Sequence, residues 1–521
     1  MSYREGAAVG VFSFGAMAVV SIVSSVLVAR LYGVAEVGRW ALAMAPANAA
    51  AFLSSFRERP AVIRELAVLP PRAPRATALL AAVFTASTLF TILVGGIVLA
   101  VAVALYRGPL HHPEVVGDTV LAMAGYVFVT SSCFNLDTGL AAFRAAGALF
   151  WIRLNQGVGF VVCTIAFSFT APDATSLVLA GIVSYAIALV HRGFALAPLL
   201  PLRISRAQMR DGFRTLPEIV RFGLKIVPGG LCDGSANQAP IWILAAAGTV
   251  VQVGAFNRAA ALQSRFTDLS YRLNEMLFPT LVERRAQGDH AGFDRALLDS
   301  LRYAAGAMLL PAAAVGGAAV GVMQIFGPGF ATAAGALAVL CAVPAAATLS
   351  NMQRHALYAV ERPWLGSAGA ALRLAVTLAV GIPLTLWIGM TGTALGAAAG
   401  FAADLAFTWT VTQRHLSRAA RTLLPWRMRL AVPLAYAAGF GAARATWTAL
   451  PSLWALPLAL LAGCVAYAAV FAASGGLAAR DRRRAADVLS ALRSRVAPHL
   501  PFARGTAKVR AASARSTPRD A

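Results

Sequence analysis

Residues 78–106 read ALLAAVFTASTLFTILVGGIVLAVAVALY, and no charged side chain interrupts them. About 20 apolar residues are enough for a helix to cross a hydrocarbon core of roughly 30 Å. A backbone in lipid must pair all its N–H and C=O groups internally, so only helices and closed barrels span membranes. Because the stretch lacks the alternation of a barrel strand, it predicts a transmembrane helix.

The composition extends this prediction to the whole chain. Of its 521 residues 59% are hydrophobic and only 13% are charged, whereas soluble domains have roughly 45–50% apolar and about 25% charged residues. The formal charge of +23 would suggest nucleic-acid binding in a soluble protein. Here the arginines fall mainly between apolar segments, so we expect an all-α polytopic membrane protein without a nucleic-acid partner.

Apolar runs of suitable length recur from one end of the chain to the other. They predict fourteen spans, with twelve as the alternative count. The candidates are 7–29, 39–56, 78–106, 118–141, 148–170, 175–197, 224–247, 254–280, 303–325, 332–353, 364–388, 392–413, 430–448 and 452–474. The first run lacks a convincing cleavage site, so we interpret it as a span and not as a signal peptide.

Arginines are concentrated in alternate connections. One set contains, for example, Arg57 and Arg59, Arg144 and Arg153, and Arg354 and Arg362. The positive-inside rule then places both termini in the cytoplasm. We expect the chain to lie in a bacterial inner membrane.

The pattern suggests two six-helix lobes and two additional C-terminal helices. The predicted units are an N-terminal lobe (1–200), a cytoplasmic inter-lobe segment (201–223), a C-terminal lobe (224–415), an accessory helix pair (428–475) and a basic cytoplasmic tail (476–521). In the inter-lobe segment Arg203, Arg206, Arg210 and Arg214 recur at helical spacing, which favours a surface helix resting on anionic headgroups.

A weak internal repeat supports the two lobes. The turns at 30–40 and 247–256 each contain a glycine, then Val-Gly, then an aromatic residue. Duplicated halves are common in secondary transporters, where the site lies between them.

The same residues carry a family resemblance. ARLYGVAEVGRWALA (29–43) resembles the first-hairpin signature of the polysaccharide transporters, the oligosaccharide flippases of the multidrug/oligosaccharidyl-lipid/polysaccharide (MOP) superfamily. Residues 61–67 (AVIRELA), 253–263 (VGAFNRAAALQ), 277–281 (LFPTL) and 325–330 (IFGPGF) are similar to later family elements, in consistent order over about residues 7–415.

The resemblance implies a flippase that moves an undecaprenyl-pyrophosphate-linked oligosaccharide, such as an O-antigen, exopolysaccharide or capsule repeat unit, by alternating access. It also implies contacts with membrane lipids, with a polysaccharide polymerase and with chain-length proteins. The family often has an acidic residue in the seventh span where this chain has Asn237 and Gln238, with Asp233 one turn earlier.

Three arginines in span 254–280 are the main candidates for a substrate path. Arg258, Arg265 and Arg272 are seven residues apart, nearly two helical turns, so they share one stripe. Arginines facing lipid would cost at least about 2.5–3.5 kcal/mol each, so they should face a cavity or partners. Arginine suits a diphosphate. The alternative is structural pairing, for which Asp268 lies within one turn of Arg265 and Arg272.

Other buried or flanking charges have two interpretations each. Arg30 and Arg39 form either a cationic rim of the path or ordinary snorkelling arginines, and Glu36 is a partner for one of them. Asp137, Asp233 and Asp404 are candidates for coupling to H⁺ or Na⁺. For Asp404 an interhelical pair with Arg373 on the preceding span is the favoured alternative.

Two other functions remain as alternatives. A cation-coupled drug or small-molecule antiporter of the same superfamily would need a cavity rich in carboxylates, whereas this central helix is net cationic. A membrane-embedded polysaccharide-assembly enzyme would need a large periplasmic loop with catalytic residues. The longest periplasmic connection here is about 107–117, which is too short. No Walker motif, Cys pair or Cys/His cluster occurs, so we expect a transporter and not an enzyme, without a cofactor or metal.

Overall fold

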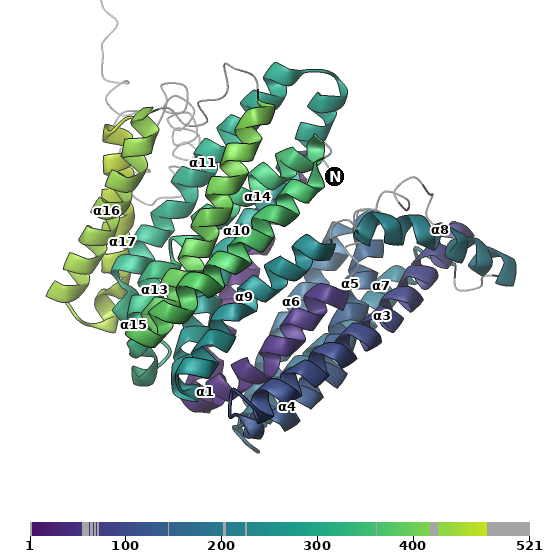
Figure 1. Ribbon diagram of the computed structural model, residues 1–521, viewed down its shortest axis with the longest axis horizontal. Helices are drawn as coiled ribbons and strands as arrows, with labels where there is room; N and C mark the ends of the chain where they lie inside the picture. Colours follow the sequence, from purple (N-terminus) through teal and green to yellow (C-terminus); the bar gives the residue numbers. More distant parts are fainter. Residues whose placement is uncertain are drawn as a thin grey trace, which may run out of the picture.

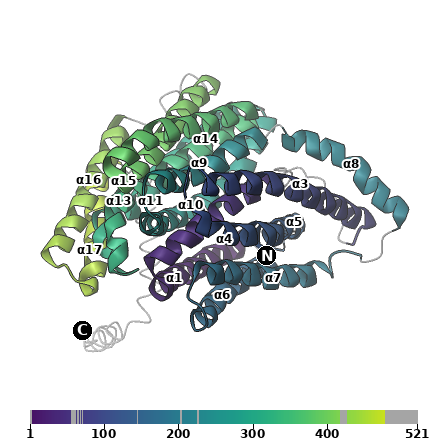
Figure 2. The same cartoon turned by 60° about the horizontal axis from the view of Figure 1, so that its bottom comes forward.

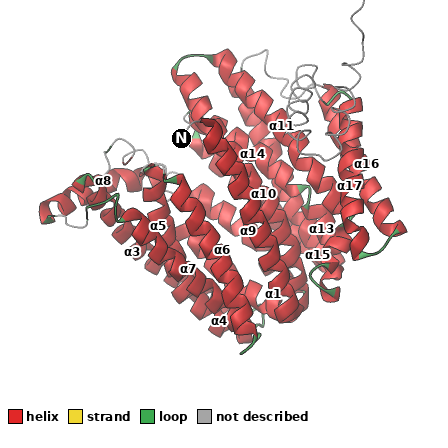
Figure 3. Cartoon of the chain, turned by 180° about the vertical axis from the view of Figure 1, so that it is seen from behind, coloured by secondary structure: helices red, strands yellow, loops and turns green. Residues whose placement is uncertain are grey.

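The computed structural model describes residues 3–54, 62, 66, 69, 72–143, 145–201, 205–224, 227–360, 362–416 and 426–476. In these ranges the regular structure is helical, and Figure 3 shows helices joined by short loops. The predicted basic tail lies almost entirely outside the described residues. Eight of the helices are long and apolar enough to cross a membrane. The chain is therefore a multi-pass membrane protein.

The first half of the chain contributes six helical segments that correspond to predicted spans, and we call such segments legs. Helix α1 (Tyr3–Ser54) bends at Gly33, whose φ of 77° is a left-handed conformation that favours glycine. It therefore contributes two legs, and three single helices follow later in this half. The remaining leg consists of α4, a π-helical turn and α5 in succession. The elements after α1 are α3 (Pro74–Arg107), α4 (Val116–Leu121), η2 (Ala122–Val127), α5 (Phe128–Ala142), α6 (Ala146–Ser168) and α7 (Ala174–Leu196).

The second half repeats this plan. Helix α15 (Pro363–His415) is broken at Ile388 and Gly389 into two legs, and α13 and α14 together form another. The other elements are α9 (Val227–Ala247), α10 (Val250–Ala286), α11 (His290–Gly317), α12 (Ala319–Gln324), η3 (Pro328–Ala333), α13 (Ala334–Leu340), α14 (Val343–Ala359), α16 (Trp426–Ala449) and α17 (Leu456–Ala473). With α16 and α17 the described legs number fourteen, which confirms the predicted count and the all-α fold.

The legs form two bundles that diverge from a common base (Figure 1). The N-terminal bundle consists of α1 and α3–α7, and the C-terminal bundle of α9–α15. Helix α1 joins them, because it contacts α9 and α10 as well as α3 and α6. Helix α8 (Arg206–Leu224) packs against α3 and leads to α9. Figure 2 shows α16 and α17 at the outer edge of the C-terminal bundle, where they pack on α11.

The bundles meet where the two repeated turns pack against each other, a contact that we call the seam. A Cβ atom on Gly38 would overlap the carbonyl of Val250, and one on Gly254 would overlap the carbonyl of Val34. The α10 turn is fixed by a capping box, in which the side chains of Thr249 and Gln252 each bond the backbone N–H of the other residue. The repeated glycines thus bring the two backbones into direct contact.

Candidate functional site

Arg258 on α10 is a buried cation between the bundles. Its side chain reaches α1, where Nη1 donates to Ser25 Oγ at 3.2 Å and Cζ lies 5.3 Å from the ring centroid of Trp40. Nη2 donates to Asn257 Oδ1 at 2.6 Å, and the residue is 3% exposed. Among the described residues no carboxylate lies within 4 Å of this guanidinium, and its Nε has no acceptor. The described groups that contact the charge are therefore neutral.

Such an arrangement favours an anionic ligand. A buried charge is costly unless it is paired, and the hydroxyl, amide and ring around Arg258 solvate it without neutralising it. A cation over an aromatic face gains roughly 0.5–2 kcal/mol, but the ring does not neutralise the charge. The guanidinium has a spare donor and a planar geometry that suits phosphate.

The rest of the predicted stripe lies on the same helix. α10 is helical from Val250 to Ala286, so Arg265 and Arg272 follow Arg258 at steps of roughly 10 Å along the axis. Arg265 is exposed and has an interaction of its own within the chain. The side chains of Arg272 and Asp268 lie outside the described residues. The choice between a substrate path and pairing with Asp268 therefore stays a prediction.

Arg30 and Arg39 lie at the seam and bind protein groups. Arg30 donates from Nε to the carbonyl of Ile325 at 2.8 Å and from Nη2 to that of Gln324 at 3.2 Å, so it caps the end of α12. Arg39 pairs with Glu36 at 2.9 Å, as the sequence suggested for one of the two arginines. Both arginines have structural contacts, and their place in a substrate path stays a prediction.

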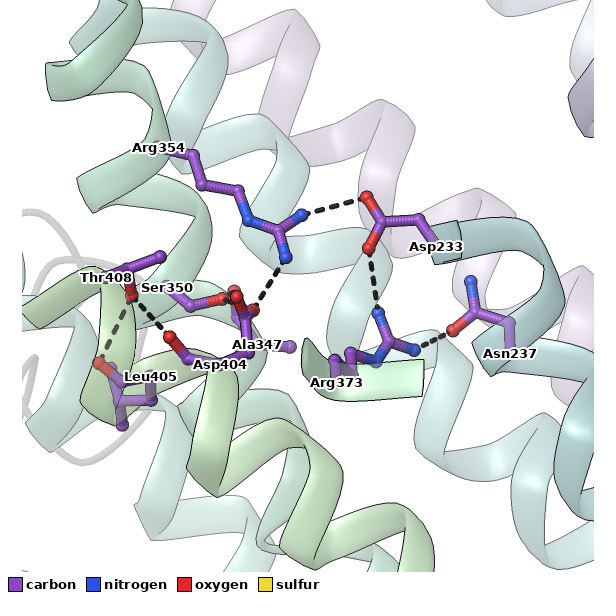
Figure 4. A network of polar contacts seen from close by, with 9 residues as sticks. All are labelled: Asp233, Asn237, Ala347, Ser350, Arg354, Arg373, Asp404, Leu405 and Thr408. Carbon is purple, nitrogen blue, oxygen red and sulfur yellow. Dashed lines mark hydrogen bonds and ion pairs between the residues drawn. The ribbon is translucent and has the colours of Figure 1, made fainter. Parts of the chain in front are cut away.

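A network of charges lies inside the C-terminal bundle (Figure 4). Arg354 on α14 bridges two carboxylates, with Nη1 2.8 Å from Asp233 Oδ2 and Nη2 2.7 Å from Asp404 Oδ2. Arg373 on α15 contacts the other oxygen of Asp233 at 3.3 Å and donates to Asn237 Oδ1. Ser350 Oγ donates to Asp404 at 2.7 Å. Two arginines therefore balance two aspartates across three helices.

The network differs from the simple pair of Asp404 and Arg373 that the sequence suggests. Asp404 binds Arg354, which the sequence places in a connection between spans, whereas the structure places it inside α14 and 7% exposed. The guanidinium of Arg373 lies 3.6 Å from the ring centroid of Phe401 and extends toward α9. Arg354 directly follows the predicted span 332–353, and this position is the signal that could have indicated its burial.

The N-terminal bundle contains a corresponding pair. Arg192 on α7 donates to both oxygens of Asp137 on α5, at 2.7 and 3.3 Å, and it is 2% exposed. Arg153 approaches the same carboxylate at 3.9 Å. Sequence reasoning selected Asp137 but missed Arg192, although an arginine within span 175–197 needed a partner. All three predicted coupling carboxylates are thus bound by arginine, and ion coupling stays a prediction.

The two-bundle architecture has counterparts among solved structures. A structure of the lipid II flippase MurJ in an inward closed conformation superposes with a TM-score of 0.62 at 10% identity, covering 89% of this chain and 97% of that one. An inward-facing multidrug resistance MATE transporter of the MOP superfamily matches with a TM-score of 0.56 at 13% identity (78% and 95% covered). A eukaryotic MATE transporter matches with a TM-score of 0.53 at 14% identity (79% and 96% covered). The chain therefore has the fold of MOP-superfamily flippases and transporters.

A family model matches more specifically. The model described as "Polysaccharide biosynthesis protein" covers residues 26–320, more than half of the chain. The chain belongs to this polysaccharide biosynthesis family, which confirms the resemblance found in the sequence. No curated protein matches the chain significantly in sequence.

Proposed function

We propose that this protein is a flippase for a lipid-linked oligosaccharide that carries a diphosphate, moved across the bacterial inner membrane by alternating access of the two bundles. The observation that carries the proposal is Arg258, a buried guanidinium between α10 and α1 whose contacts among the described residues are all neutral. The polysaccharide biosynthesis family supports a glycan substrate. The fold shared with the lipid II flippase MurJ supports a lipid carrier, for which undecaprenyl pyrophosphate has the required charge.

The same charge argues against the alternative functions. If the protein were an antiporter for cationic drugs, the drug would pass Arg258 between the bundles and the exposed Arg265 on the same helix. Both arginines repel a cationic substrate. A polysaccharide-assembly enzyme is disfavoured by the fold of this chain, which is shared with a lipid II flippase and a MATE transporter. We therefore propose a transporter without its own catalysis, which delivers its product to a polymerase and chain-length proteins.

The orientation of the proposed cycle follows from the charges. Arg284, Arg285 and Arg414 lie at the ends of α10 and α15 that are remote from the seam, and the positive-inside rule assigns this side to the cytoplasm. The bundles also spread apart toward this side, where the N-terminus lies (Figure 1). In this orientation the seam closes the periplasmic side and both termini are cytoplasmic. Movement would be coupled to H⁺ or Na⁺ through Asp137, Asp233 or Asp404.

The test is the export of surface glycan by a deletion strain that expresses Arg258→Met. We expect export to fall at least roughly tenfold, because removal of one charge-assisted contact costs about 1.5–3 kcal/mol, while membrane insertion stays normal. Arg258→Lys should retain part of the activity. Arg285→Gln, which removes an exposed arginine at the opposite end of α10, is the matched control. Full export by the Arg258→Met strain would remove the proposal.

A further inference from the structure

Helix α8 has two distinct faces, and only one packs on the described part of the protein. Gly212 lies against the backbone of Ala78 so closely that a Cβ would overlap it. Leu216 and Ile219 join an apolar cluster with Leu79 and neighbouring residues of α3. This face attaches α8 to the N-terminal bundle, and among the described residues the opposite side of the helix is exposed.

The outer face of α8 is a stripe of arginines. A helix turns roughly 100° per residue, so the stripe occupies an arc of about 80° and is centred roughly 150° from the packed face. All its members are exposed; they are Arg206, Arg210, Arg214 and Arg221. Of these, Arg214 lies 3.5 Å from Asp211, in a pair whose side chains are both more than 60% exposed and which therefore contributes little.

Within the part of the chain that the structure describes, the other three arginines of the stripe are without acidic partners. Among the described residues no carboxylate lies within 4 Å of Arg206, Arg210 or Arg221. Glu218 is the second acid on this helix, so four arginines against two acids give α8 a net charge of +2. A solvent-exposed cationic stripe beside an apolar bundle is complementary to an anionic membrane surface.

The position of α8 along α3 places it at headgroup level. Helix α3 has 34 residues and its charged side chains, Arg75 and Arg107, lie at its two ends. At about 1.5 Å per residue it is roughly 50 Å long and extends beyond a hydrocarbon core of about 30 Å. Because α8 packs at Ala78, in the second turn of α3, it lies where the lipid headgroups begin. The exposed Phe213 beside the stripe can insert among them.

A cavity of about 550 Å³ lies between the start of α3 and α8. Its lining includes one guanidinium from each helix, and its residues are Pro74, Arg75, Gln208, Asp211 and Arg214. This volume is within the range of small-ligand sites, roughly 300–1,000 Å³. We propose that the arginine stripe and this cavity bind the headgroup of an anionic phospholipid, with Arg75 and Arg214 on the phosphate. The proposal does not depend on the transported substrate.

The test uses the full-length protein in detergent, with phosphatidylglycerol as the probe and phosphatidylcholine as the neutral comparison. Native mass spectrometry measures how much of each lipid stays bound. We expect the triple variant Arg75→Gln/Arg210→Gln/Arg214→Gln to retain roughly tenfold less phosphatidylglycerol, because it removes both arginines proposed for the phosphate and because each basic residue near a surface contributes measurably to anionic-lipid binding. Phosphatidylcholine retention should stay unchanged.

A second triple variant removes the same charge from the other bundle. Arg285→Gln/Arg295→Gln/Arg414→Gln alters exposed arginines of α10, α11 and α15, and it should keep most of the bound phosphatidylglycerol. An equal loss of bound phosphatidylglycerol in both variants would refute the proposed site, because net charge alone would then explain the binding. Displacement of the lipid by millimolar inorganic phosphate would also overturn it, because it would assign the arginines to a free anion.

Discussion

Gly38 and Gly254 pack reciprocally across the seam, each against a backbone carbonyl of the other repeat. Gly38 lies on Val250 and Gly254 lies on Val34, so the two halves contribute the same feature to one contact. Glycine allows the backbones to approach this closely because it has no Cβ. In the proposed cycle this contact must separate whenever the periplasmic side opens.

Gly38→Leu should keep the seam apart. No side chain fits between Gly38 and Val250, so the variant should favour the conformation in which the periplasmic side is open. The reporter is Val37→Cys in a background whose native cysteines are replaced, because Val37 directly precedes Gly38 and is fully buried. Labelling of this introduced thiol by a membrane-impermeant maleimide should rise several-fold when Gly38→Leu is added.

The control for this change is Gly96→Leu. Gly96 is exposed on α3, and nothing lies within 4 Å of the position that a Cβ would occupy, so labelling at position 37 should stay low. Equal labelling in both variants would show that Gly38 does not determine the closure of the seam.

Arg30→Gln should loosen the seam, whereas Arg39→Gln should not. Arg30 on α1 donates two hydrogen bonds to carbonyls at the end of α12, in the other bundle. These bonds are exposed, so each contributes about 0.5–1.5 kcal/mol, but both join one bundle to the other. Arg39 instead forms an exposed pair with Glu36 on its own helix, and such pairs contribute about 0–1 kcal/mol. Maleimide labelling at position 37 should therefore rise only with the Arg30 variant, and a similar rise with both would contradict this distinction.

The spans could be predicted because lipid imposes a strong rule on sequence. A long uncharged run such as 78–106 has few stable structures other than a membrane-spanning helix. The described fold contains the fourteen legs expected. The family resemblance was also recognisable, since the short motifs at 29–43 and 253–263 were in order. The structure adds that these two segments contact each other at the seam, which no local pattern could indicate.

The partners of buried charges could not be predicted equally well. Asp137 and Asp404 were visible as intramembrane acids, but pairing depends on the rotation of each helix and on its depth. The sequence places Arg354 in a loop because it follows an apolar run, although it lies at the centre of the network between Asp233 and Asp404. A shift of a few residues in a span boundary is enough to produce this error.

Arg354→Met should destabilise the C-terminal bundle strongly. It would leave Asp404 without its arginine at 2.7 Å and Asp233 dependent on Arg373. Breaking a buried pair by removing one partner typically costs about 3–5 kcal/mol. Thermal unfolding of the detergent-solubilised protein measures the effect, with Arg354→Lys as a comparison that keeps the charge but cannot bridge both carboxylates equally well.

The matched change in an exposed pair is Arg284→Met. Arg284 binds Asp289 at 2.8 Å, but both side chains are more than 40% exposed, so its loss should lower the melting temperature only slightly. If Arg354→Met melted at the wild-type temperature, the network of Figure 4 would contribute no stability.

Arg258→Met should have the opposite effect on stability, because it removes a buried charge that no described carboxylate neutralises. Replacing buried charge by a well-packed apolar side chain is often stabilising, here by an amount on the order of 1 kcal/mol. The variant should therefore melt at or above the wild-type temperature while it fails to export glycan. A functional residue that costs stability in this way is kept for its ligand. A lower melting temperature would instead show that Arg258 is structural, with its contacts to Ser25 and Trp40 stabilising the junction of α1 and α10.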